Sequence, residues 1–197
     1  MALDAGLAAL LVRATARVSA VILAGNLLVA ARRVGGAAER DALPATELRR
    51  LDVATFVAFI VSHTIHFVCV GLLTIATAGA NIDARTGYAP VIAVGVLFYL
   101  ACGAALRVKL RCSRVWAQPR NRRIEVWSLV AIWLAFFQAY ITRPLQSWLF
   151  AALAIGLLYS MLVFLARARQ RRITEETGSH RETAQRRATE ACDQRPA

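Results

Sequence analysis

Long stretches without a charged residue constrain this sequence most. Four of them contain 28, 18, 17 and 23 residues and occupy positions 53–80, 89–106, 126–142 and 144–166. A helix needs roughly 20 predominantly apolar residues to cross the hydrocarbon core of a bilayer, so each stretch is a credible span. In a soluble domain of this size, surface charges would interrupt such runs. The sequence therefore predicts an integral membrane protein.

A fifth span is predicted at residues 7–31, although it contains Arg13 and Arg17. A secretory signal peptide would carry its positive charges before the apolar segment rather than inside it. A helix beginning at Val18 would have only 14 residues before Arg32, which is too short to cross. We therefore expect a spanning helix with two intramembrane arginines.

The distribution of charge predicts the orientation of the spans. Segment 107–123 holds seven basic residues and no acidic one, and segment 31–50 holds five against three, whereas link 81–88 holds one of each. Cytoplasmic loops carry the excess of Lys and Arg. We expect an all-α, polytopic membrane helix bundle of about five transmembrane helices, with the N-terminus outside and the C-terminus cytoplasmic.

Two regions follow from this pattern: a transmembrane helix bundle, 1–166, and a basic cytoplasmic tail, 167–197. The tail is rich in charge and poor in apolar residues. We expect it to extend the last helix by a turn or two and then to be partly disordered. His180 lies in this tail and is interpreted as a solvated residue.

The net charge of +12 would suit nucleic acid, but no helix-turn-helix or aromatic-interleaved pattern accompanies it. We therefore predict no nucleic acid partner, and expect the basic links to contact anionic headgroups of the lipid bilayer. Cys69 and Cys102 fall in spans, while Cys112 and Cys192 fall on the reducing side. No disulfide framework is expected.

Two histidines and two arginines are expected inside apolar spans. With a rise of about 1.5 Å per residue, His63, His66 and Arg17 lie near the middle of the bilayer, and Arg13 lies one turn shallower. An arginine at the centre of a span costs roughly 2.5–3.5 kcal/mol to insert, and the spans contain no acidic residue to neutralise it. A bound anion such as a haem propionate is one explanation. The other is contact with lipid phosphate, or a first helix that lies partly in the interface.

His63 and His66 are three residues apart, so both side chains can face the same interior seam. Either they hydrogen-bond backbone carbonyls and neighbouring hydroxyl groups, or at least one of them ligates haem iron or another metal. Other polar residues in spans are expected to form interhelical hydrogen bonds: Asn26, Gln138, Tyr140 and Tyr159. Tryptophans near span ends are expected to be interfacial anchors: Trp116, Trp127 and Trp148.

The chain resembles the small bacterial members of the ferric reductase-like transmembrane family in four segments: "RATARVSA" (13–20), "LRRLDVATFVAFIVSHTIHF" (48–67), "TGYAPVIAVGVLFYLACGAALR" (86–107) and "RRIEVWSLVAIWLAFFQAYITR" (122–143). The most specific pieces are Arg13-x-Thr15-Ala16-Arg17 and Ser62-His63-x-x-His66. The resemblance implies haem b held between helices, electron transfer across the membrane, and location in the bacterial cytoplasmic (inner) membrane. It assigns His63 and His66 as candidate haem ligands, with Arg13 and Arg17 near the propionates.

The chain departs from the family pattern near the start of the fourth span. Where family members usually carry further histidines, this sequence has Glu125 and Val130. His63 and His66 lie one turn apart on one helix and approach an iron from the same side, so they cannot supply both axial ligands. A haem would then be five-coordinate, use another sixth ligand, or be shared across a homodimer.

Three functions are consistent with these patterns. The first is a membrane electron-transfer or oxidoreductase component with haem b, which needs a separate redox partner protein or a quinone because the chain has no flavin or nicotinamide domain. The second is a haem-free accessory or scaffold membrane protein of the same fold. The third is a membrane enzyme that acts on a lipophilic substrate through His63 and His66.

Overall fold

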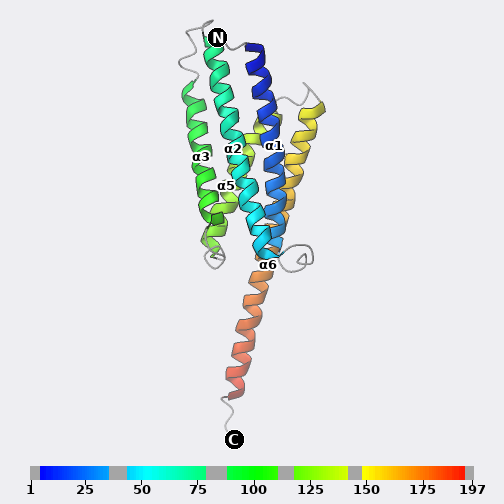
Figure 1. Ribbon diagram of the computed structural model, residues 1–197. Helices are drawn as coiled ribbons and strands as arrows, with labels where there is room; N and C mark the ends of the chain where they lie inside the picture. Colours follow the sequence, from blue (N-terminus) through cyan, green and yellow to red (C-terminus); the bar gives the residue numbers. More distant parts are fainter. Residues whose placement is uncertain (1–4, 36–43, 79–87, 111–117, 142–147, 194–197) are drawn as a thin grey trace.

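The computed structural model describes residues 5–35, 44–78, 88–110, 118–141 and 148–193, and these ranges contain five α-helices and no strand. The helices are α1 (Ala5–Gly35), α2 (Ala45–Ala78), α3 (Tyr88–Leu110), α5 (Pro119–Ile141) and α6 (Trp148–Asp193). Their axes run side by side, with the two chain termini at opposite ends of the molecule (Figure 1). The all-helical fold predicted from the sequence is confirmed.

Each helix packs between two others, and together they close a ring. Going round it, α1 packs against α2, α2 against α3, α3 against α5, α5 against α6, and α6 against α1. The α1–α2 contact is the most extensive of these interfaces. Successive helices alternate in direction, as short links between neighbouring helices require.

Four helical segments are long and apolar enough to cross a membrane by length and composition: Gly6–Gly35, Ala45–Thr74, Ala93–Leu110 and Trp148–Thr174. The protein is therefore an integral membrane protein with a helical bundle. Helix α5 is not among these four segments. The span expected at 126–142 stays a prediction, as does the orientation of the bundle.

Buried residues recur every three or four positions along each helix. On α1, the interior positions Ala20, Leu23, Leu27, Ala30 and Val34 follow this spacing. The same spacing on the other helices is given by Asp52, Phe56, Phe59 and His63; Phe98, Cys102 and Ala105; Glu125, Leu129, Ile132 and Phe136; and Leu157, Met161 and Phe164. A repeat near 3.5 residues keeps one narrow seam of each helix facing its neighbours.

Hydrogen bonds across the helix interfaces supplement this packing. Thr64 Oγ1 of α2 lies 3.0 Å from the Tyr99 hydroxyl of α3. Trp133 Nε1 of α5 donates to the Leu157 carbonyl of α6 at 2.9 Å. Lipid is as apolar as leucine, so interhelical packing and hydrogen bonds of this kind are what hold membrane helices together.

Helix α6 continues far beyond its apolar part. Its 46 residues extend to Asp193, and at about 1.5 Å per residue they give a rod of roughly 69 Å. The second half projects from the bundle as a single straight arm (Figure 1). The expectation that the helix stops a turn or two after residue 166 is wrong. Between Pro144 and Pro196 no proline removes a backbone donor, so nothing in the backbone interrupts the helix.

Candidate functional site

A polar seam joins α1 to α2 near the middle of the bundle. Thr15 Oγ1 lies 3.1 Å from His66 Nδ1, and Ser19 Oγ lies 2.9 Å from Ser62 Oγ. Going from Thr15 to Ser19 along α1 therefore corresponds to going from His66 back to Ser62 along α2. This antiparallel register places Arg17, between Thr15 and Ser19, at the level of the histidines, in agreement with the depth argument from the sequence.

Arg17 and Arg13 nevertheless point away from the histidines. The Cζ atom of Arg17 lies 5.4 Å from the centre of the Phe150 ring on α6, a cation–π distance. Its Nε atom is buried and meets no hydrogen-bond acceptor in the part of the chain that is described. Arg13, one turn away on the same helix, is exposed on the outside of the bundle. Arg17 therefore lies on the α1–α6 side, and Arg13 is exposed.

His63 lies on the opposite side, inside an aromatic cage. Its ring centroid is 4.4 Å from that of Phe98 on α3, 4.7 Å from Phe136 on α5 and 4.8 Å from Phe67 on α2. His66 stacks beside it with 5.5 Å between ring centroids. Only 8% of His63 is exposed, and its Nδ1 has no hydrogen-bond partner among the described residues. The cage is filled by its own rings.

As arranged here, these residues do not fit a haem. A haem ligated by His63 would need space for a planar macrocycle directly against the ligating ring nitrogen. The rings of Phe98 and Phe136 already occupy the space against His63. Nδ1 of His66 is engaged by the Thr15 hydroxyl, which itself donates to the Leu11 carbonyl. Arg17 lies against Phe150 of α6 rather than beside His63.

A metal site of other composition does not assemble within the described ranges either. No three side chains of the types His, Cys, Asp and Glu gather there closely enough to hold a metal ion. Cys69 is half-buried and Cys102 is buried, and both are free thiols. The side chains of Cys112, Cys192, His180, Tyr140 and Trp116 lie outside the described residues.

The second polar centre is a ring of four charges at the opposite end of α1 from Ala5. Arg33 of α1, Asp52 of α2, Lys109 of α3 and Glu125 of α5 each contribute one charge. Lys109 Nζ lies 2.6 Å from Asp52 Oδ1 and 3.1 Å from Glu125 Oε1. Arg33 Nε lies 3.0 Å from Asp52 Oδ2, and its Nη2 bonds Glu125 Oε1. Cations and anions alternate around a closed, neutral cycle.

The charge ring, as we call Arg33, Asp52, Lys109 and Glu125, is shielded from solvent. The side chains of Asp52 and Lys109 are fully buried, and that of Arg33 is 11% exposed. Lys109 Nζ also lies 5.2 Å from the centre of the Phe56 ring. Buried charges persist only where each is paired and further hydrogen-bonded. Each charge of the ring is paired with two of opposite sign, and Asp52 also accepts a hydrogen bond from Asn26.

Asn26 adds a hydrogen bond from α1 to the charge ring. Its Nδ2 lies 2.9 Å from the Asp52 carbonyl, 3.1 Å from Asp52 Oδ1 and 2.8 Å from Thr55 Oγ1. The sequence prediction that Asn26 makes an interhelical hydrogen bond is confirmed. Tyr159 behaves differently: it is 63% exposed on the outside of α6 and does not line the bundle. Trp127 and Trp148 are exposed, as interfacial anchors require.

Sequence reasoning found the histidines and arginines but missed the charge ring. In the sequence, Arg33 and Lys109 belong to the basic segments that predict the orientation, and Asp52 and Glu125 each directly precede a charge-free stretch. A signal was present, because the first four helices each carry one of these charges at the same end of the bundle. An acid that lies next to an apolar span among many bases indicates a buried ion pair.

Comparison with known proteins gives no neighbour: no family model, curated protein or solved structure matches this chain.

Proposed function

We propose that this chain is a haem-free accessory or scaffold subunit of a membrane assembly. The observation that carries the proposal is the filled interior at the level of His63, where Phe98, Phe136 and Phe67 close around the imidazole. A cofactor or substrate site is normally a cavity with a few convergent polar groups. Here the described polar groups of the α1–α2 seam bond each other instead.

The charge ring supports a scaffold role because it fixes four helices relative to one another. Each ion pair joins two different helices, so any helix that shifts or rotates breaks two contacts at once. Removing one partner of a buried pair costs about 3–5 kcal/mol. A bundle held in this way is a fixed platform rather than a moving gate.

The projecting arm of α6 supports contact with another protein. It continues the membrane helix without a break, so its position follows that of the bundle (Figure 1). Beyond residue 166 it is composed mainly of polar and charged residues. A mostly polar helix gains little from burial on its own bundle, so its length is best explained by an external partner.

The first experiment is a visible absorption spectrum of the purified full-length chain, reduced minus oxidised, with haem supplied during expression. We expect no Soret band and a cooperative thermal unfolding transition. A Soret band that persists in wild type and disappears in His63→Ala/His66→Ala would contradict the proposal. His180→Ala is the matched control, because it removes a histidine outside the bundle.

The second experiment tests the partner. Cells expressing the full chain, or a chain ending at Thr174, are crosslinked in intact membranes, and the adducts are identified by mass spectrometry. We expect one reproducible adduct with the full chain that disappears with the shortened chain, while both reach the membrane in equal amounts. Equal adducts from both chains, or none from either, would remove the arm from the proposed function.

We propose haem-dependent electron transfer as the second candidate. The shared level of Arg17, His63 and His66, established by the α1–α2 register, favours it, as does the resemblance to ferric reductase-like proteins. It requires Phe98 and Phe136 to leave the imidazole, a second axial ligand from a homodimer partner or another protein, and a redox partner protein or quinone. The same spectrum separates the two candidates.

A further inference from the structure

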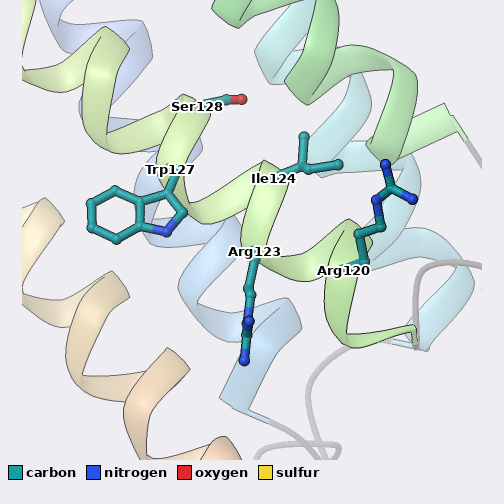
Figure 2. A pocket seen from close by; sticks show the side chains of 5 residues that line it. All are labelled: Arg120, Arg123, Ile124, Trp127 and Ser128. Carbon is teal, nitrogen blue, oxygen red and sulfur yellow. The ribbon is translucent and has the colours of Figure 1, made fainter.

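A pocket of about 540 Å³ opens on the outer side of α5, apart from both polar centres. It is lined by five residues from about two and a half turns of this helix: Arg120, Arg123, Ile124, Trp127 and Ser128. Figure 2 shows these five side chains along α5, with Arg123 between Trp127 and Arg120 in this view. We propose that this pocket binds the headgroup of an anionic phospholipid.

The charge of the pocket selects an anion. Arg120 and Arg123 are both exposed, and within the described ranges neither forms an ion pair with a carboxylate. Nearby Glu125 is turned into the bundle, where it forms ion pairs with Arg33 and Lys109. Two guanidinium groups one turn apart therefore carry uncompensated positive charge. Guanidinium binds phosphate oxygens through paired N–H donors.

The apolar side of the pocket selects a lipid over a free anion. Trp127 is 69% exposed and Ile124 is 37% exposed, both on the membrane side of the arginines along α5. A large exposed indole next to basic residues is the arrangement found at the border between headgroups and acyl chains. The buried Ser128 hydroxyl lines the pocket one residue further. Charge and apolar surface thus follow the order of a phospholipid from phosphate to acyl chain.

The position along α5 agrees with this order. Glu125, at the level of the charge ring, separates the arginine-rich first turns from the apolar remainder of the helix. The seven basic residues of segment 107–123 concentrate positive charge at this end. Anionic lipids of the cytoplasmic leaflet are attracted by about 1 kcal/mol per Lys or Arg close to the surface. The proposal does not depend on whether the protein binds haem.

The test measures lipid retained by the purified full-length chain in native mass spectrometry. The probes are dioleoyl phosphatidylglycerol, dioleoyl phosphatidylcholine and inorganic phosphate. We expect one molecule of phosphatidylglycerol to be retained by wild type. Arg120→Gln/Arg123→Gln should weaken this binding about 30-fold, because each arginine close to the membrane surface contributes about 1 kcal/mol to the binding of an anionic lipid. Arg32→Gln/Arg169→Gln, which removes two exposed charges outside the pocket, should leave it within about twofold.

Each other outcome counts against the proposal. Equal weakening by both double variants would mean diffuse attraction rather than a pocket. Equal retention of phosphatidylcholine would mean a nonspecific lipid shell, and equal binding of inorganic phosphate would mean a free-anion site. Trp127→Ala should weaken phosphatidylglycerol and leave phosphate unchanged; if it alters neither, the apolar half of the assignment fails. Circular dichroism of every variant establishes that the helices are retained.

Discussion

The middle of the bundle and the end that carries the charge ring use different polar groups to join neighbouring helices. In the middle, α1 and α2 are joined by hydroxyl and imidazole groups without a paired charge, and the space beside them is filled by aromatic rings. At the other end, four charges from four helices pair with one another. An ion is cheapest to bury near the interface, where desolvation is incomplete, and most expensive at the bilayer centre. The two regions therefore differ in the groups that join the helices: neutral polar groups in the middle and paired charges at the end.

The largest effect is expected from breaking the charge ring at its most buried acid. Asp52→Asn leaves Arg33 and Lys109 with a single carboxylate between them and should lower the free energy of unfolding by about 3–5 kcal/mol. Denaturation by SDS in mixed micelles, followed by circular dichroism, measures this change. Glu47→Gln is the control, because its pair with Arg50 is exposed and should cost less than about 1 kcal/mol. Equal stability of D52N and wild type would remove the distinction between the two regions.

A double variant sharpens the same comparison. Lys109→Met with Glu125→Met removes one charge of each sign and leaves Arg33 paired with Asp52. We expect this protein to be more stable than the sum of the two single variants predicts, by about 0.5–3 kcal/mol. The same denaturation experiment on all four proteins gives the coupling energy. A coupling near zero would show that the ring acts as independent contacts.

The aromatic cage should tolerate a change of chemistry but not of volume. His63→Phe keeps a ring against Phe98 and Phe136 and should cost less than about 1.5 kcal/mol. His63→Ala opens a cavity and should cost roughly 2 kcal/mol or more. Thermal unfolding in detergent compares the two. If phenylalanine is as damaging as alanine, His63 has a polar role that the packing does not account for.

The smallest effect is expected in the polar seam. Thr15→Val removes the hydroxyl that bonds His66 and should cost about 0.6 kcal/mol, the average for a hydrogen bond between membrane helices. Thr174→Val, whose hydroxyl bonds only its own helix, serves as control. A loss of more than about 2 kcal/mol at Thr15 would place the stability of the bundle in the seam rather than in the charge ring.

The sequence correctly predicted that Arg17 of α1 lies at the level of His63 and His66 of α2. The position of a residue along a helix axis depends only on residue count. The sequence also predicted Asn26 as an interhelical donor because a buried amide in a span needs a partner. It did not predict that Arg17 and His63 face opposite sides. The spans are apolar all round, so hydrophobic periodicity gives no inward face, and only the register between helices fixes the rotation of each.

By itself, the sequence determined that this protein is helical and embedded in a membrane. A chain with charge-free runs of this length must satisfy its backbone hydrogen bonds internally, and a helix does so within one segment. Only the tertiary structure decided which polar groups meet. Arg33 and Glu125 are 92 residues apart, and the choice between pairing, packing against a ring or facing lipid depends on how five helices close around one another.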